Sequence, residues 1–299
     1  MPFREPNVIL FLQHGWADDN RAMLKLGEQL AIPGTEVVAS SLNYVQTWLR
    51  IDPLIQEVEA IAQTTMARHP GIPLRIVGHS MGGLIWLEVL NRNPSWRANV
   101  HSLVLVGSPV GGADLGRILD PLQVGVGIAG DLGKNRKALA AHIAAIVPTL
   151  IIAGDLDGGS DGVVPVECTR FPHAQFVRLP GISHPALRSH SSVAATIREF
   201  WVGLQVGEAV VLDDVIHRLH AVPGMTDGHM RDFAKSKVLF HLKNGGTLRT
   251  WTNVFGVAHV FVADAEGTCR YAGFVGWLHN SDLQRAIANI HQDEHLSIQ

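Results

Sequence analysis

The stretch that decides the fold is Leu74–Trp86, LRIVGHSMGGLIW, in which one serine lies between glycines. A strand-like apolar run precedes Ser80, and a helix-like apolar run follows it. A strand that turns abruptly into a helix holds the residue at its apex in a strained backbone conformation. Gly78 and Gly82, two positions before and after the serine, leave room for such a turn. We therefore predict that Ser80 is a nucleophile, presented at the carboxyl end of a sheet.

The segments around this elbow alternate between strands and helices. Short apolar runs predict strands at residues 7–13, 35–40, 74–77, 102–106, 149–153 and 175–179. Amphipathic spacing predicts helices at residues 19–31, 52–69, 83–91 and 191–201. This alternation indicates an α/β fold, with a mostly parallel sheet that helices cover on both faces.

Residues 111–145 interrupt the alternation, because they are rich in Gly, Leu and Val and predict only loops and short helices. Two interpretations stay open. The segment is either a cap inserted over one end of the sheet or an irregular crossover helix with a long loop. Its apolar character favours a substrate with an apolar acyl part over a sugar or a nucleotide.

The pattern changes after Trp201, which divides the chain into a catalytic domain at residues 1–203 and a smaller domain at residues 204–299. In the second part we expect helices at 207–220 and 282–291 and strands at 237–242, 247–252, 257–263 and 268–275. Asn244-Gly245-Gly246 is a strong hairpin signal. A small α+β domain with an antiparallel sheet follows, and one role open to it is homo-oligomer formation.

Composition narrows the class of protein. The chain has 299 residues, of which 46% are hydrophobic and 17% charged, with a net charge of −3, as in an ordinary globular protein. A small negative net charge gives no indication of a nucleic-acid partner. The first apolar run is too short for a signal peptide or a membrane span, so we expect a cytoplasmic protein without a transmembrane segment. Two distant cysteines predict neither a disulfide framework nor a metal site, and nothing in the sequence implies a cofactor.

A nucleophilic serine needs a histidine to accept its proton and a carboxylate to orient that histidine. On a strand–helix elbow the expected chain order is serine, acid, histidine. Asp155, Asp157 and Asp161 all follow the strand at 149–153, and the residues alone leave the choice among them open. His184 follows the next strand and is the favoured base, whereas His190 is expected at the start of the following helix.

Main-chain amides are expected to stabilise the oxyanion that such a serine generates. Gln13-His14-Gly15-Trp16 leaves the first strand at the same edge of the sheet. We expect the two amide donors to be those of Trp16 and of Met81, the residue after the serine.

With these motifs in place, residues 6–201 resemble the α/β-hydrolase family, in its lipase and esterase branch, which includes class 2 lipases and inositol-deacylase-like proteins. The resemblance is carried by QHGW, VGHSMGG, LVLVGSPVGGADLG, GSDGVVP and LPGISHPAL. It implies that Asp161 is the acid, supports His184, and implies hydrolysis of a small-molecule ester through an acyl-serine intermediate without a cofactor. Nothing is carried over to residues 204–299.

Two other functions remain open. The same three residues would serve an acyltransferase or a thioesterase, because the first half-reaction is identical. A ligand-binding protein that keeps the fold but turns over slowly or not at all is the second alternative. Among the remaining residues, Trp86 is expected in the core, and His101, His142 and His173 are expected at the surface or in loops.

Overall fold

The computed structural model describes residues 6–42, 50–112, 131–203, 206–210 and 213–295. Its first sheet has the strand order β2-β1-β3-β4-β5-β6-β7, and every pair is parallel except β6 with β7. The strands are β1 (Val8–Gln13), β2 (Thr35–Ser40), β3 (Leu74–His79), β4 (Val100–Val106), β5 (Thr149–Asp155), β6 (Gln175–Pro180) and β7 (Glu208–Ala209). This arrangement confirms the predicted parallel α/β sheet.

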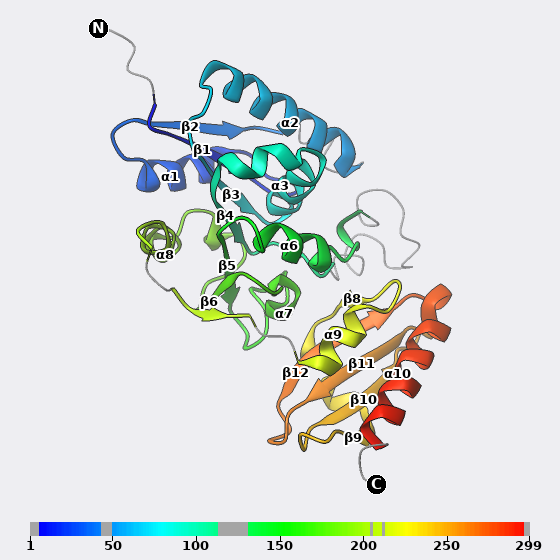
Figure 1. The fold of residues 1–299 in the computed structure, drawn as a ribbon. Coiled ribbons are helices and arrows are strands. Elements are labelled where there is room, and N and C mark those ends of the chain that lie inside the picture. The colour runs from blue at the N-terminus through cyan, green and yellow to red at the C-terminus, as the bar shows by residue number, and fades with distance from the viewer. Residues whose placement is uncertain (1–5, 43–49, 113–130, 204–205, 211–212, 296–299) are drawn as a thin grey trace, which may run out of the picture.

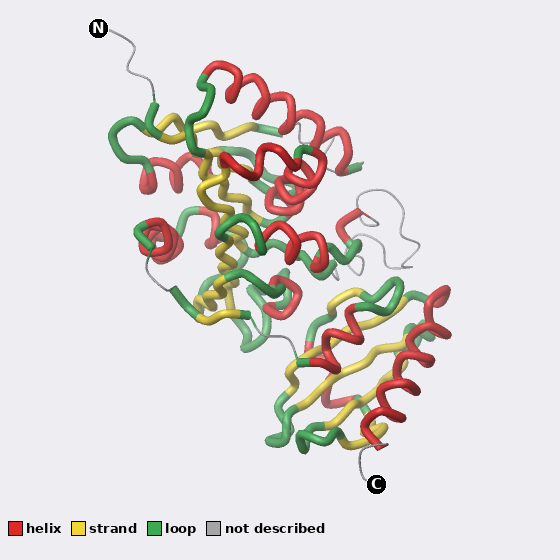
Figure 2. The backbone as a smooth tube through the Cα atoms, in the orientation of Figure 1, coloured by secondary structure: helices red, strands yellow, loops and turns green. Residues whose placement is uncertain are grey.

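Helices cover both faces of this sheet (Figures 1 and 2). Buried side chains of α2, α3 and α6 pack on one face, and those of α1 and α8 pack on the other. The short α7 joins β5 to β6. The helices are α1 (Arg21–Leu30), α2 (Ile51–Arg68), α3 (Met81–Arg92), α6 (Lys137–Ala144), α7 (Val166–Thr169) and α8 (Ser191–Trp201).

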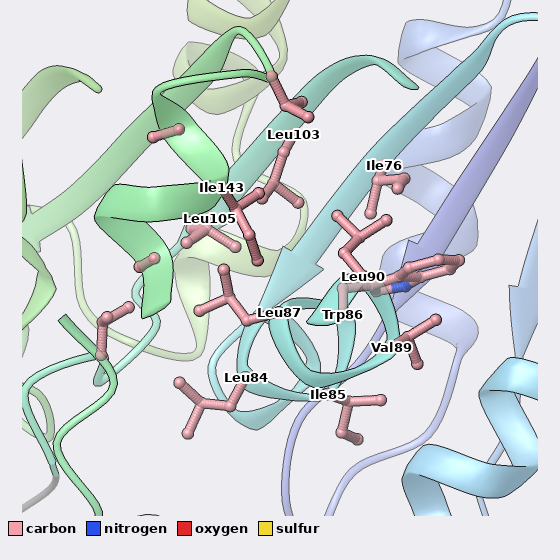
Figure 3. Close-up of a cluster of buried hydrophobic side chains, with 14 of the residues drawn as sticks. Ile76, Leu84, Ile85, Trp86, Leu87, Val89, Leu90, Leu103, Leu105 and Ile143 are labelled. Carbon is pink, nitrogen blue, oxygen red and sulfur yellow. The ribbon is translucent and has the colours of Figure 1, made fainter. Parts of the chain in front are cut away.

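The helix α3, which follows the serine, lies deep in the core. Figure 3 shows its apolar side chains beside Ile76 of β3, Leu103 and Leu105 of β4, and Ile143 of α6. Trp86 is 1% exposed, and its ring centroid lies 5.0 Å from that of Phe11. The expected core position of Trp86 is confirmed, and this packing fixes the position of the helix that follows Ser80.

Residues 213–295, here called the C-terminal unit, contain a five-stranded antiparallel sheet with the order β8-β12-β11-β10-β9. Its strands are β8 (Thr226–Asp227), β9 (Lys237–His241), β10 (Thr247–Thr252), β11 (Ala258–Ala263) and β12 (Cys269–Val275). The helices α9 (Asp214–His220) and α10 (Asn280–His295) cover one face of it (Figure 1). The expected antiparallel sheet is confirmed, including the hairpin at Gly245, where φ is +84°. The domain boundary near residue 203 stays a prediction.

The helix expected at 207–220 is wrong in its first half. Glu208–Ala209 forms β7, and α9 begins only after the cap at Asp213, whose carboxylate accepts from the Val215 amide. The physical reason lies at Gly207. Its φ is +75°, and a Cβ there would lie 2.0 Å from the Phe176 carbonyl oxygen. The chain is therefore pressed against β6, where it adds a strand.

A buried polar cluster joins the C-terminal unit to α6 and to the loop that leaves β4. Asp227 is fully buried, and its amide donates to the Gly111 carbonyl over 3.1 Å. Its carboxylate lies 2.6 Å from Lys137 Nζ, 3.2 Å from His220 Nε2 and 3.0 Å from the Tyr271 hydroxyl. The unit thus docks next to the loop that leaves β4.

The segment at 111–145, interpreted above as either a cap or an irregular crossover, is described only in part, because residues 113–130 lie outside the described residues. The helix α6 is one of the short helices predicted for this segment. In the ranges that the structure describes, no helix is both long enough and apolar enough to cross a membrane.

Candidate active site

Ser80 lies at the apex of a sharp turn between β3 and α3. Its φ is +54° and its ψ is −127°, a conformation that non-glycine residues rarely adopt. A Cβ on Gly78 would lie 2.5 Å from the Gly83 Cα, within the turn itself. A Cβ on Gly82 would lie 2.3 Å from the Gln13 carbonyl oxygen. The prediction that both glycines are needed for steric reasons is therefore confirmed. Gly78 leaves room for the turn itself, whereas Gly82 leaves room for the end of β1.

The structure brings Asp161 and His184 together. His184 Nδ1 lies 2.6 Å from Asp161 Oδ2, and the His184 amide donates to the Asp161 carbonyl over 2.8 Å. The other carboxylate oxygen, Oδ1, accepts from the amides of Val163 and Val164 at 2.9 and 2.7 Å. Four hydrogen bonds thus hold the carboxylate and the imidazole in one orientation.

The two other candidate acids lie elsewhere. The carboxylate of Asp155 binds the Arg178 guanidinium. The carboxylate of Asp157 accepts from the Ser160 amide at 2.7 Å and from its hydroxyl at 2.8 Å. His190 caps α8, accepting from the Ser192 amide through Nδ1, as expected for the start of that helix.

Gly107, at the end of β4, connects these groups in space. The Ser80 amide donates to the carbonyl of the preceding residue, Val106, over 2.8 Å. A Cβ on Gly107 would lie 3.2 Å from His184 Nδ1 and 3.3 Å from Asp161 Oδ2. The serine, the imidazole and the carboxylate are therefore gathered around one glycine at the carboxyl ends of β3, β4 and β5.

Sequence reasoning missed His79, the residue before the serine. It is buried, its ring centroid lies 4.6 Å from that of His184, and its Nε2 lies 3.1 Å from the His184 carbonyl. Burial, with His184 nearby, holds the pKa of His79 well below its ordinary value of 6.5. Its only signal in the sequence is its place inside the serine motif, which does not reveal the contact with residue 184.

His14 shapes the loop that leaves β1. The Leu42 amide donates to His14 Nε2 over 3.0 Å, so Nδ1 carries the proton and donates to the Gly15 carbonyl over 2.9 Å. Burial holds the pKa of His14 below 6.5, in keeping with this neutral form. A Cβ on Gly15 would lie 2.7 Å from that of Ser80, so the loop touches the serine.

A salt bridge connects this loop to the segment after His184. Arg188 lies in that segment, and its guanidinium is 2.5 Å from the Asp18 carboxylate. The residues expected to supply an oxyanion donor and those that carry the imidazole are thus held together across the sheet edge.

A cavity of about 770 Å³ lies away from these groups, between α6 and α9, lined by Lys137, His217, His220 and Met225 among others. Among the described residues, no group of three or more His, Cys, Asp or Glu side chains is placed to hold a metal ion.

Residues 4–137 match a family model described as "Serine aminopeptidase, S33" (Hydrolase_4). The match includes Ser80 and both expected oxyanion donors and ends before Asp161. No curated protein matches the chain.

Solved structures of similar fold include several lipases and esterases. The esterase EaEST from Exiguobacterium antarcticum is 16% identical, with a TM-score of 0.51 over 67% of this chain and 94% of its own. A soluble variant of the monoglyceride lipase of Saccharomyces cerevisiae is 12% identical, with a TM-score of 0.50 over 67% and 87%. The Bacillus licheniformis lipase BlEst2 in propeptide form is 13% identical, with a TM-score of 0.54 over 92% and 72%. That last match includes most of residues 204–299.

Proposed function

We propose that this chain, which has the α/β-hydrolase fold and matches a hydrolase family model over residues 4–137, is a serine hydrolase that cleaves carboxylic esters through an acyl-serine intermediate. The observation that carries this proposal is the 2.6 Å contact between His184 Nδ1 and Asp161 Oδ2, next to a strained Ser80. A carboxylate only accepts hydrogen bonds, so the imidazole proton lies on Nδ1. The lone pair of Nε2 is then left to accept the serine proton.

In the proposed reaction, His184 removes the proton of the Ser80 hydroxyl as the oxygen attacks the ester carbonyl. Asp161 stabilises the imidazolium that forms and keeps the ring in its orientation. The imidazolium then protonates the leaving alcohol. Water, activated by the same histidine, releases the acid and restores the free serine.

The amides of Met81 and Trp16 are the proposed oxyanion donors. Met81 is the first residue of α3, and its amide has no acceptor within the helix. The Gly15–Trp16 peptide has its carbonyl held by His14 Nδ1. Because this peptide is trans, its N–H, which is the Trp16 amide, points in the opposite direction from the carbonyl that His14 binds. Each such donor contributes about 3 kcal/mol of transition-state stabilisation.

The proposed substrate is a small-molecule ester with an apolar acyl part. Two features support this class. The neighbouring folds include an esterase and a monoglyceride lipase, and the segment at 111–145 is rich in apolar residues.

The test is hydrolysis of p-nitrophenyl butyrate, with labelling by a fluorophosphonate probe. Ser80→Ala removes the nucleophile, so we expect labelling to vanish and kcat to fall by about a millionfold. The control is Ser102→Ala, since Ser102 is a buried serine of β4. Unchanged turnover in Ser80→Ala would reject the proposal. Failure of the wild-type protein to label would favour the ligand-binding alternative.

A second candidate activity is amide hydrolysis, which is favoured by the description of the matching family model as a serine aminopeptidase. The same three residues would perform it, with an amine as leaving group. Comparing kcat/KM for p-nitrophenyl butyrate and for aminoacyl p-nitroanilides separates the two. A thioester substrate and added alcohol acceptors in the same series test the thioesterase and acyltransferase alternatives.

A further inference from the structure

Two loops of the C-terminal unit expose large apolar side chains next to each other. The loop between β10 and β11 exposes Val254 by 93% and Phe255 by 61%. The turn between β12 and α10 exposes Trp277 by 66% and Leu278 by 90%. We call these four residues the apolar tip. Side chains of this size are normally buried, so a group of four in one place indicates a surface that binds something.

The tip has a defined geometry. Ala258 pairs with Val275, so both loops emerge at the end of the sheet where α10 begins (Figure 1). Trp277 Nε1 donates to the Phe255 carbonyl over 2.9 Å, which joins one loop to the other. The Asn253 side chain accepts from the amides of Phe255 and Val257 at 2.9 and 3.0 Å. The turn therefore holds its apolar residues outward.

The tip is also free of formal charge. Residues 253–263 and 271–281, which form both loops, the whole of β11 and most of β12, contain no Asp, Glu, Lys or Arg. At the margin, the exposed Lys237 of β9 lies opposite Thr250 and adds a positive charge beside the tip. Arg285, 72% exposed, follows on α10, 3.5 Å from Asp282. Asp282 offsets the charge of Arg285, so the neutral apolar centre has the cation of Lys237 at its margin. This arrangement fits a lipid surface that carries some negative charge.

The size and shape of the tip favour a lipid surface over a protein partner. A stable interface between two proteins buries about 800 Å² on each side. Four side chains on two turns provide much less, and they project instead of forming a groove. Projecting aromatic and aliphatic side chains can instead enter the boundary between headgroups and acyl chains, where Trp is favoured.

We propose that the apolar tip docks the protein on a phospholipid surface, with Val254, Phe255, Trp277 and Leu278 entering the acyl boundary. Binding does not depend on the chemistry of Ser80. Its use, to bring the enzyme to esters that are poorly soluble in water, rests on the proposed function.

The test is flotation of the full chain with vesicles of phosphatidylcholine and phosphatidylglycerol. Val254→Ser with Leu278→Ser replaces the two most exposed side chains of the tip, which can be changed without loss of core packing. We expect the vesicle-bound fraction to fall by at least about tenfold. The matched control is Ile32→Ser with Ile146→Ser, since these side chains are 57% and 58% exposed elsewhere on the chain. The control protein is expected to float like the wild type.

Three results would overturn the proposal. The first is a wild-type chain that does not float, and the second is equal loss in the tip and control variants. The third is a wild-type dimer, seen by sedimentation, that becomes monomeric in the tip variant without vesicle binding, because the tip would then bind a second copy. Turnover of soluble p-nitrophenyl butyrate, measured on the same variants, tests the proposed function separately, since the tip variant is expected to keep it.

Discussion

His79 Nε2 donates a hydrogen bond of 3.1 Å to the main-chain carbonyl of His184. The residue before the proposed nucleophile thereby holds the loop of the proposed base. Because a carbonyl only accepts hydrogen bonds, the proton of this bond lies on Nε2 of His79. Burial disfavours a second proton on Nδ1, so the His79 ring is neutral. A neutral ring next to His184 does not oppose the positive charge that His184 gains during the proposed reaction.

Replacing His79 tests this positioning role. His79→Leu leaves the His184 carbonyl without its donor, so we expect kcat for p-nitrophenyl butyrate to fall by about 10- to 100-fold with little change in KM. His79→Gln provides an amide N–H at a similar reach and is expected to restore most of the activity. Equal activity in the Leu and Gln variants would contradict the role of the hydrogen bond.

The buried histidines make stability depend on pH. Burial lowers the pKa of His79 and of His14 below 6.5, their ordinary value. Above pH 6.5 both rings are neutral in the folded and unfolded chain. Below it the unfolded chain binds protons that the folded chain does not, so the free energy of unfolding falls as pH falls, by up to about 1.4 kcal/mol per pH unit for each ring.

Urea unfolding at pH values on either side of 6.5 measures this effect. His79→Gln, which cannot titrate, is expected to show a smaller loss of stability toward low pH than the wild type. If the free energy of unfolding changes equally with pH in both proteins, groups other than His79 cause the pH dependence.

The acid is tested by three matched substitutions. Asp161→Asn keeps the shape but allows the wrong tautomer of His184, so we expect kcat to fall by about ten-thousandfold. Asp155→Asn and Asp157→Asn alter contacts with Arg178 and Ser160, and both are expected to keep kcat within about threefold. A large loss of kcat in either control, with folding intact, would move the acid away from residue 161.

Gly82 is expected to tolerate no side chain. A Cβ there would lie 2.3 Å from the Gln13 carbonyl oxygen, a backbone atom that cannot yield cheaply. Gly82→Ala should therefore lower the free energy of unfolding by about 1–3 kcal/mol or more. Gly276→Ala is the control, since its φ is −67° and no heavy atom lies within 4 Å of its Cβ position. Thermal unfolding of both variants measures the difference.

The buried Asp227 joins two parts of the chain, and its loss should be costly. Burial acts to raise the pKa of its carboxyl, but Lys137 and His220 hold it below its ordinary value. Asp227→Asn leaves the Lys137 ammonium buried without its counter-charge, so we expect a loss of about 3–5 kcal/mol in urea unfolding. Asp293→Asn, in an exposed pair with Arg218, should cost about 1 kcal/mol or less. Similar losses would contradict the role of the buried cluster.

The strands and helices around Ser80 could be predicted because local patterns determine them. The apolar runs at β1, β3, β4 and β5 are short, continuous and bounded by turn residues, as strands buried on both faces must be. The β7 strand could not be predicted, because Glu208–Ala209 becomes a strand only through its contact with β6. The apolar tip was missed for a related reason, since exposure depends on what packs against a residue.

The sequence by itself determined the elbow. Glycines on both sides of one serine, between a strand pattern and a helix pattern, leave few other structures that the backbone can adopt. The residues alone left Asp155, Asp157 and Asp161 open, and only the family resemblance favoured Asp161. The tertiary structure places Asp161 against His184 and places His79 against the loop of His184. These pairs are separated by 23 and 105 residues. Such contacts depend on the register of neighbouring strands and on how their loops cross the sheet edge, which no local pattern records.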